Sequence, residues 1–403
     1  MKKKLKIAIY SGSIPSTTFI EHLIHEVAKH HTVLLFGNIK SHIKYNNANI
    51  KIISTPYEKW RYIPLTIWRM LLLFFKRPSY IKAAYQRAKQ YPTNYLKLIR
   101  FTRYIAVLLH EPDIFHLQWA RRIERWTFLK EVYDCKLMLS LLGTQITVAP
   151  RNNKTLADSF KKHFPKVDYF NAVSKHTADE ALKYGVDPQK IQVLYIPISQ
   201  LVFDKFRIPK KTDGQPIEIV SVGRYDWVKG YRYAIDAIKL LIDQGHQVKY
   251  TIIAQGKVNE DLLFQVHQLG IQSHVAFEKS LAQEQLFSRM QEFDILLLPS
   301  VTEGIANVAL EGMALGIPVI STDCGGMPEV VKTNQTGWLV SSRDPQAICD
   351  AVLKIKNTSD AHLREVVKEA HDLATKYFHP SNGMKHFIEA YSDLKNKSEL
   401  GNG

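Results

Sequence analysis

Two glutamates, Glu303 and Glu311, lie eight positions apart in the segment DILLLPSVTEGIANVALEGMALGIPVISTDCGGMPEVV, residues 294–331. The segment opens with an apolar run typical of a buried strand, and helical periodicity follows from Gly304 to Gly316. Backbone N–H groups at a helix start lack intrahelical partners and attract anions. We therefore expect an anion or phosphate to bind the amides of Gly304, Ile305, Ala306 and Asn307. Each carboxylate can accept two hydrogen bonds, which suits a ribose diol or sugar hydroxyls.

A second set of charged residues follows an earlier expected strand. The run SVGR ends that strand at Gly223 and Arg224, and Lys229 precedes the next helix. Two cations five positions apart beside one strand end suit a diphosphate. Ligands of open α/β sheets bind outside the carboxyl ends of the strands. The two sets together predict a site for a phosphorylated ligand in the second half of the chain.

The elements that must position these residues alternate between strand-like and helix-like segments, which is typical of parallel α/β units. Helical periodicity is clearest in residues 231–244, 306–315 and 345–355. The polar, turn-rich residues 203–216 are the expected linker. Strands are expected near residues 5–10, 32–37, 50–54, 114–117, 136–141, 168–173, 191–195, 217–222, 248–254, 274–277, 293–298, 318–321 and 337–340.

Length and composition favour a globular protein of two domains. A chain of 403 residues is too long for one ordinary core, and a hydrophobic content of 45% argues against disorder. Only three cysteines occur, without a CxxC pair, so a disulfide scaffold and a structural zinc site are not expected. No signal peptide and no transmembrane helix are expected, because the apolar runs are too short. We therefore expect a cytoplasmic protein.

Basic residues are concentrated in the first half of the chain. Residues 1–200 contain 32 Lys/Arg and 13 Asp/Glu, whereas the remainder contains 22 and 25. Such asymmetry indicates a polyanion, an anionic membrane surface or a solvated basic face. The segment WRYIPLTIWRMLLLFFKR, residues 60–77, suits a helix lying in a membrane interface at the inner face of the cell membrane. A core helix with basic flanks is the alternative.

The second half of the chain resembles the nucleotide-binding domain of retaining GT-B glycosyltransferases, often called family 4 (glycosyl transferases group 1). The resemblance is carried by Glu303 and Glu311 with seven residues between them, by Arg224 and Lys229, and by the run GGMPE at residues 325–329. In the first half, SIPSTTFIEHLIHEVAKH, residues 13–30, is similar to the start of bacterial exopolysaccharide and lipopolysaccharide transferases.

The resemblance implies a fold and an activity. The fold would be GT-B, two facing Rossmann-like α/β/α domains with a deep interdomain cleft. Residues 1–200 would bind the acceptor, residues 201–380 the nucleotide-sugar, and the helix in residues 381–403 would cross back to the first domain. The activity would be metal-independent, retaining hexosyl or deoxyhexosyl transfer to a glycan or lipid-linked acceptor in cell-surface polysaccharide or lipopolysaccharide biosynthesis.

The resemblance also implies roles for particular residues. Arg224 and Lys229 would hold the donor diphosphate and stabilise the leaving group. Glu311 would bind the ribose hydroxyls, and Glu303 would bind the donor sugar together with the amides of residues 304–306. No metal or other cofactor is expected, since the sequence contains no Asp-x-Asp.

Several positions of the first half are candidates for the acceptor or donor-sugar side of the site. Relatives have His-Gly-x-Asp where this chain has Leu142-Gly143-Thr144-Gln145, and the missing histidine contacts the donor sugar near O6. A 6-deoxy donor is one explanation for Leu142; a substituting residue or a weakly active protein are the others. The remaining candidates are Gly143, Ser13 and Thr17 in loops and His116 near a strand end. His116 faces either the cleft or the core.

A different class of function is a GT-B-fold protein that is non-catalytic or weakly active and binds membrane or a polyanion through its basic half. A basic groove with aromatic side chains could also hold single-stranded nucleic acid. No recognisable nucleic-acid module surrounds the aromatic residues 60–77, so nucleic acid is not the expected partner.

Overall fold

Two open parallel sheets form the framework of the computed structural model, which describes residues 4–41, 43–56, 59–209 and 216–399. The chain divides into two units. Unit 1 comprises Met1–Ala172, Ala178–Leu194 and Met384–Gly403, and unit 2 comprises Val173–Thr177 and Tyr195–Gly383. The short segment Val173–Thr177, expected in the first domain, groups with unit 2 because Glu329 accepts hydrogen bonds from the amides of Lys175 and His176.

Unit 1 contains a seven-stranded sheet in the order β3-β2-β1-β4-β5-β6-β7. Its strands are β1 Lys6–Ile14, β2 Thr32–Ile39, β3 Ile50–Ser54, β4 Ile114–Leu117, β5 Lys136–Leu141, β6 Tyr169–Ala172 and β7 Ile191–Val193. The helices of this half are α1 Thr18–His30, α2 Lys59–Lys76, α3 Pro78–Ala88, α4 Asn94–His110, α5 Leu129–Val132, α6 Thr144–Thr147, α7 Lys154–His163 and α8 Lys175–Leu182. Short 3₁₀ turns add η1 Ala120–Arg125, η2 Phe164–Lys166 and η3 Pro188–Lys190.

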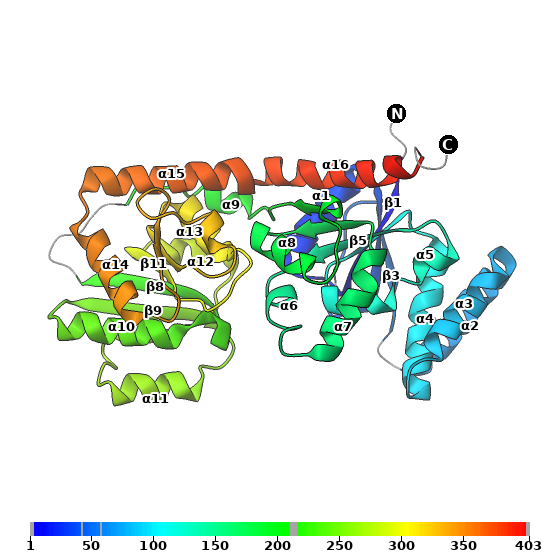
Figure 1. Ribbon diagram of the computed structural model, residues 1–403, viewed down its shortest axis with the longest axis horizontal. Helices are drawn as coiled ribbons and strands as arrows, with labels where there is room; N and C mark the ends of the chain where they lie inside the picture. Colours follow the sequence, from blue (N-terminus) through cyan, green and yellow to red (C-terminus); the bar gives the residue numbers. More distant parts are fainter. Residues whose placement is uncertain (1–3, 42, 57–58, 210–215, 400–403) are drawn as a thin grey trace. The chain divides into compact units, whose positions relative to one another are not determined.

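Unit 2 contains a six-stranded sheet in the order β10-β9-β8-β11-β12-β13. Its strands are β8 Ile217–Arg224, β9 Val248–Gln255, β10 Val275–Lys279, β11 Ile295–Leu298, β12 Val319–Thr322 and β13 Trp338–Val340. Three of these strands, β8, β9 and β11, are labelled in Figure 1. The helices of this unit are α9 Gln200–Phe203, α10 Tyr231–Asp243, α11 Glu260–Gln268, α12 Gln283–Met290, α13 Asn307–Leu315, α14 Pro345–Asn357 and α15 Asp360–Phe378, with 3₁₀ turns η4 Trp227–Lys229 and η5 Met327–Glu329. The last helix, α16 Pro380–Glu399, begins in unit 2 and lies mostly in unit 1.

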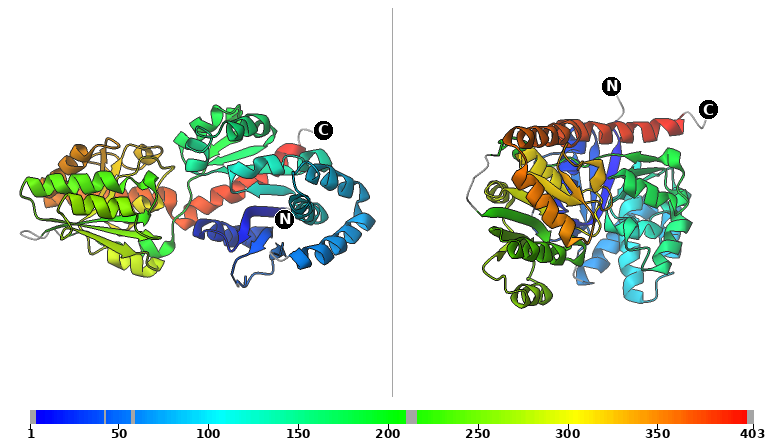
Figure 2. Two further views of the ribbon diagram at one scale, coloured as in Figure 1. Left: turned by 90° about the horizontal axis from the view of Figure 1, so that it is seen from below. Right: turned by 60° about the vertical axis from the view of Figure 1, so that its left-hand side comes forward.

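Each sheet is covered by helices on both faces, as the views in Figure 2 show. Successive side chains of a strand point to opposite faces, so a strand buried on both faces is apolar throughout. In β8, Ile219 belongs to the core beneath α10 and α14, whereas Val220 belongs to the core beneath α13 and α15. In β1, Ala8 belongs to the core on one face of the unit 1 sheet and Ile9 to the core on the other face. This double burial explains why the strands could be predicted from short apolar runs.

Helix α16 supplies part of the core of unit 1. Met384, Phe387, Tyr391 and Leu394 recur every three or four residues, so they share one helix face. That face packs against α1 and one face of the unit 1 sheet, where Tyr391 is fully buried. The face of the sheet covered by α1 is therefore completed by residues from the far end of the sequence.

The predicted segments agree with the structure in most places. Every expected strand is present, and the periodic segments form α10, α13 and α14. Residues 60–77 form most of α2, and the predicted linker lies partly outside the described residues. Within the described ranges, no helix combines the length and the apolar character needed to cross a bilayer.

Candidate functional site

The two halves of the unit 2 sheet diverge between β8 and β11. The chain proceeds from β8 through β9 to β10 on one side, and from β11 through β12 to β13 on the other. Loops that follow neighbouring strands in such a sheet turn away from each other, which leaves a crevice at the carboxyl edge. Arg224 ends β8 and Glu303 follows β11, so the topology brings the two predicted charge sets to this crevice.

The Lys229–Glu303 ion pair joins the two loops. Nζ of Lys229 donates to Oε1 of Glu303 at 2.7 Å, and both side chains are only about 15% exposed (15% and 16%). The hydroxyl of Ser300 donates to the same carboxylate oxygen at 3.1 Å. A cation and an acceptor held together at a strand-end crevice can bind a phosphate and a hydroxylated ligand side by side.

Two glycines make room for this pair. A Cβ on Gly223 would lie 2.8 Å from the hydroxyl of Tyr231 and 3.1 Å from Cε of Lys229. Gly230 has a φ of +65°, and a Cβ there would lie 2.0 Å from the carbonyl oxygen of Pro299. The lysine can therefore approach the β11 loop only because glycine occupies both positions.

The Gly325-Gly326 run is packed against the loop that carries Glu303. A Cβ on Gly325 would lie 1.8 Å from the carbonyl oxygen of Glu303, and a Cβ on Gly326 would lie 2.0 Å from that of Gly304. The same substitution at Gly326 would also approach Cβ of Ser174 to 2.7 Å. The two glycines thus fix the backbone of the Glu303 loop by close approach.

Helix α13 begins later than predicted. The sequence pattern suggested a start at Gly304, whereas the helix begins at Asn307 with Ala306 as its N-cap and no capping side chain. The amide of Ala306 points to the sulfur of Met327 at 3.3 Å, a weak acceptor. Asn307 is exposed, Ile305 is half-buried and Gly304 is buried. The predicted set of free helix-start amides is therefore wrong for Ala306, because residues 304–306 pack against Met327 and Gly326.

Glu311 lies one turn into α13, separate from the Lys229–Glu303 pair. Burial raises the pKa of its carboxyl to about 7, and a hydrogen bond from Gln283 of α12 opposes the shift. A carboxyl with this pKa is poised between its two protonation states near neutral pH. Hydrogen-bond donors from a ligand would favour the charged form.

Tyr231 lies near Arg224 and the Lys229–Glu303 pair and was missed by sequence reasoning. Burial raises the pKa of its hydroxyl, and the charges of Glu303 and Arg224 act on it in opposite directions. The hydroxyl oxygen is buried without a hydrogen-bond partner among the described residues. Arg224 itself is exposed at the end of β8. A tyrosine at the first position of a helix carries no sequence signal of this role.

Four of the predicted residues of unit 1 lie at the carboxyl ends of its strands, Ser13 within β1 and the other three in the loops or caps that follow β1 and β5. Ser13 is half-buried near the end of β1, and Thr17 is the exposed N-cap of α1, where its side chain makes no capping hydrogen bond. Leu142 and Gly143 follow β5, and Gly143 has a φ of +38° as the N-cap of α6. Leu142 is half-buried.

His116 is a core residue. It is fully buried on β4, its Nδ1 lies 2.6 Å from the hydroxyl of Tyr391, and its Nε2 lies 2.8 Å from the hydroxyl of Ser140. Burial lowers the pKa of its imidazole to about 3, so the ring is neutral. The prediction that His116 lines a ligand cleft is wrong, because α16 covers this part of the sheet.

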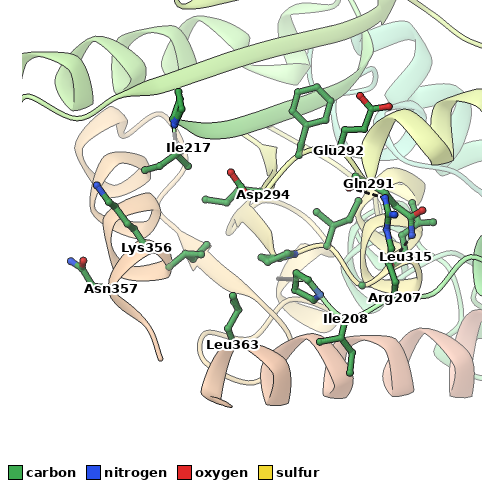
Figure 3. A pocket seen from close by; sticks show the side chains of 18 of the residues that line it. Arg207, Ile208, Ile217, Gln291, Glu292, Asp294, Leu315, Lys356, Asn357 and Leu363 are labelled. Atoms are coloured by element: carbon green, nitrogen blue, oxygen red, sulfur yellow. Dashed lines mark hydrogen bonds between the residues drawn. The ribbon is translucent and has the colours of Figure 1, made fainter. Parts of the chain in front are cut away.

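A cavity of about 840 Å³ lies at the opposite edge of the unit 2 sheet. Its lining includes Ile217 and Ile295, the first residues of β8 and β11, and Asp294. Figure 3 shows Arg207 on its wall, hydrogen-bonded to the carbonyl of Gln291. The cavity is therefore remote from the carboxyl-edge crevice. Among the residues with described positions, no three His, Cys, Asp or Glu side chains are grouped as a metal site requires.

Comparison with known proteins identifies the domain that carries this crevice. Residues 202–373 match the family described as "Glycosyl transferases group 1". HepE from Anabaena in complex with UDP has the same fold, with a TM-score of 0.68 and 16% identity over 97% of this chain and all of that chain (100%). The predicted pair of Rossmann-like domains of the GT-B fold and the resemblance to group 1 glycosyltransferases are thus confirmed.

Two curated relatives are similar over part of their length. The amylovoran biosynthesis glycosyltransferase AmsK of Erwinia amylovora is 31% identical over 53% of this chain and 56% of its own length. The putative colanic acid biosynthesis glycosyltransferase WcaL of Escherichia coli K12 is 30% identical over 53% of each chain. The match thus spans about half the length of these relatives.

Proposed function

We propose that this chain, which carries a glycosyl transferases group 1 domain on a GT-B fold, transfers a sugar from a nucleotide-sugar to a glycan or lipid-linked acceptor. The Lys229–Glu303 pair at the unit 2 crevice is the observation that carries the proposal. The names of AmsK and WcaL, from the biosynthesis of amylovoran and colanic acid, support a role in the assembly of a cell-surface polysaccharide.

The donor binds at the unit 2 crevice in this proposal. Lys229 and Arg224 contact the diphosphate, and Glu303 accepts hydrogen bonds from sugar hydroxyls. Glu311 accepts hydrogen bonds from the ribose diol. The UDP complex of HepE, which has the same fold, supports a nucleoside diphosphate as the leaving group. The absence of a side chain at Gly223 leaves room for Tyr231 and Lys229 beside the donor diphosphate.

The reaction we propose retains the configuration of the anomeric carbon. The bond between that carbon and the diphosphate oxygen breaks, and its electron pair stays on the diphosphate. The acceptor hydroxyl attacks from the same face and gives its proton to a departing phosphate oxygen. The protein then needs no nucleophile, and its contribution is electrostatic stabilisation of the leaving charge by Arg224 and Lys229. Cys324 is not used as a nucleophile in this proposal. Burial raises the pKa of its thiol to about 11, so the thiol stays protonated at neutral pH.

Unit 1 would receive the acceptor and contact an anionic membrane. Helix α2 buries a narrow stripe, Tyr62, Thr66, Arg69 and Leu73, and exposes an apolar face. That face, hereafter the α2 face, comprises Trp60, Ile63, Ile67, Trp68, Leu71, Leu72, Phe74 and Phe75. Exposed Arg61, Lys76 and Arg77 flank it. An exposed apolar helix face with basic flanks suits an anionic lipid interface.

A donor screen tests the function. Purified protein would be incubated with a panel of nucleotide-sugars and an extracted glycan acceptor, and released nucleoside diphosphate would be measured. We expect nucleoside diphosphate to be released from nucleotide-sugars of one base, and the release to persist in the presence of EDTA. The product should show retained anomeric configuration by NMR. Release that is unchanged in Arg224→Ala, or no release with any donor, would contradict the proposal.

A further inference from the structure

Four arginines lie on the two elements, α4 and η1, that border the carboxyl edge of the unit 1 sheet. Arg100 and Arg103 are three residues apart on α4, and Arg122 and Arg125 are three residues apart on η1. Residues at this spacing share a face in an α-helix and are eclipsed in a 3₁₀-helix. Arg100 also lies close enough to Arg125 and Arg103 that their charges, after burial, lower its pKa. We call these four residues the arginine cluster.

The arginine cluster borders the point where the unit 1 sheet divides. The chain proceeds from β1 to β2 and β3 on one side and from β4 to β7 on the other, so the crevice lies between β1 and β4. Arg122, which follows β4, packs against the end of β1: a Cβ on Gly12 would lie 2.5 Å from its Nη1. Nη2 of Arg103 donates to Oδ1 of Asn38, near the end of β2, at 2.8 Å.

Carboxylates among the described residues do not balance the positive charge of the arginine cluster. In the part of the chain that the structure describes, no carboxylate forms an ion pair with Arg100, Arg103 or Arg122, and Arg125 meets only its neighbour Glu124, at 3.7 Å. The Nε atoms of Arg100, Arg103 and Arg125 are buried without a hydrogen-bond partner. The guanidinium of Arg100 lies over the ring of Tyr91, 5.0 Å from its centroid.

Like charges gathered in a partly buried crevice repel one another, and their solvation by water is reduced. A bound anion removes both costs. Guanidinium groups match phosphate oxygens bidentately, and several of them together suit a group that carries more than one negative charge.

We propose that the arginine cluster binds a phosphate or diphosphate group of the acceptor substrate. The inference rests on the proposed glycosyltransferase function, because it assumes that unit 1 receives the acceptor. It goes beyond that function by naming a chemical group that the acceptor must carry.

Binding of inorganic pyrophosphate to the full-length protein tests the inference without any transfer reaction. The Arg224→Gln variant would first remove the contribution of the unit 2 crevice. In that background we expect Arg100→Gln and Arg122→Gln to weaken the remaining pyrophosphate binding at least about tenfold by calorimetry. Arg121→Gln is the matched control, because Arg121 is exposed on the same 3₁₀ turn and its loss removes the same charge.

The outcomes are distinct. Equal binding by Arg121→Gln, Arg100→Gln and Arg122→Gln would overturn the inference, as would complete loss of binding in Arg224→Gln alone. Because the assay needs no donor, absence of sugar transfer would refute the proposed function and leave the anion site standing. A structural role is tested by the melting temperature: we expect Arg122→Gln, without pyrophosphate, to equal or exceed the wild type, because a repelling charge is removed.

A competition experiment separates the sources of the phosphate. Geranyl diphosphate, a short isoprenoid diphosphate, should displace pyrophosphate from the arginine cluster. Phosphatidylglycerol vesicles should not displace pyrophosphate from a variant in which the exposed apolar residues of the α2 face are replaced by serine. Displacement by vesicles but not by geranyl diphosphate would assign the cluster to the bilayer and overturn the acceptor assignment.

Discussion

At the scale of single residues, the Lys229–Glu303 pair makes two kinds of contribution that a substitution can separate. The pair is mostly buried, so its loss leaves Glu303 with Ser300 as its one hydrogen-bond donor among the described residues and costs about 1–3 kcal/mol of unfolding free energy. We predict that Lys229→Ala lowers kcat by about 10²–10³-fold as well, because leaving-group stabilisation is lost. Denaturant unfolding and single-turnover kinetics would measure the two effects.

Lys239→Ala is the matched control for that prediction. Lys239 also pairs with an acid, Asp243, but on the exposed side of α10. Its loss should cost less than about 1 kcal/mol and leave kcat unchanged. A kcat for Lys229→Ala that matches Lys239→Ala would remove Lys229 from the site.

Glu311 predicts a pH dependence of stability. Its folded-state pKa is raised to about 7 from 4.5, so between these values the folded protein holds a proton that the unfolded chain has released. Its contribution to stability is complete below pH 4.5 and is lost as the pH rises through 7. The loss is on the order of 3 kcal/mol. Calorimetric unfolding from pH 5 to 8 should show this decline in the wild type relative to Glu311→Gln.

The same carboxyl predicts the pH dependence of ligand binding. Because a ribose diol donates hydrogen bonds to the charged form, nucleoside diphosphate affinity should rise from pH 6 to 8 more in the wild type than in Glu311→Gln. The variant corrects for titration of the ligand's own phosphate. If the pH profiles of the wild type and Glu311→Gln are parallel, Glu311 does not contact the ligand.

The sequence alone predicts those site residues whose position follows from the topology of the sheet. Arg224 and Glu303 could be predicted because both follow strands of one parallel sheet, whose carboxyl ends share an edge. Tyr231 could not, since its role depends on how its hydroxyl packs beside Gly223. His116 was misjudged because its covering partner, Tyr391, lies 275 residues away in the sequence.

At the scale of elements, glycine contacts decide how the site loops are held. Gly326 has a φ of −89°, so a side chain there is not strained by the backbone but meets Gly304 and Ser174. We predict that Gly326→Ala destabilises unit 2 by roughly 2 kcal/mol or more, through displacement of the Glu303 loop. Chemical denaturation and donor affinity would measure the effect.

Gly245→Ala gives the comparison. Gly245 has a φ of +80° and nothing within 4 Å of its Cβ position, so only backbone strain of about 1 kcal/mol is expected. Donor affinity should stay at the wild-type value. Equal effects of the two substitutions on donor affinity would mean that the close approach at Gly326 does not organise the site.

The α2 face predicts vesicle binding. Phe75 and Trp68 are 84% and 60% exposed, and burying two such rings in a bilayer contributes several kcal/mol. We predict that the double substitution Trp68→Ser, Phe75→Ser lowers binding to phosphatidylglycerol vesicles at least tenfold in a sedimentation assay. High salt should weaken wild-type binding, because Arg61, Lys76 and Arg77 flank the face.

Phe264→Ser on α11 controls for the general loss of an exposed aromatic residue, since Phe264 is also exposed. Vesicle binding of Phe264→Ser should equal that of the wild type. If the α2 substitutions and Phe264→Ser behave alike, membrane contact does not occur through α2.

Strands were the elements best predicted from sequence, because burial on both faces favours successive apolar residues in the central strands. The start of α13 was less predictable. Residues 304–306 continue the helical pattern, yet their backbone is held by Met327 and by the approach of Gly326. These contacts come from a segment twenty residues further along the chain and leave no mark on the local pattern.

At the scale of the whole molecule, the two units should respond to different ligands. We predict that UDP slows hydrogen exchange in residues 223–230 and 299–306 of unit 2 and leaves α11 unchanged. Pyrophosphate should in addition slow exchange in residues 100–125 of unit 1. Mass spectrometry of the intact protein with each ligand would test this; UDP protection confined to unit 1 would contradict the proposed donor site.

Helix α16 sets an order of events during synthesis. The unit 1 sheet is complete once residue 193 has been made, but its core also needs Met384, Phe387 and Tyr391. At 5–20 residues per second, the ribosome needs roughly 10–40 s to make the intervening residues. During that time the face of the unit 1 sheet beneath α1 lacks the side chains of α16, and all residues of unit 2 are made before that face is complete. A purified chain truncated after Gly383, the last residue of unit 2, should therefore hold a protease-resistant unit 2 and a protease-sensitive unit 1, the reverse of their order in the sequence.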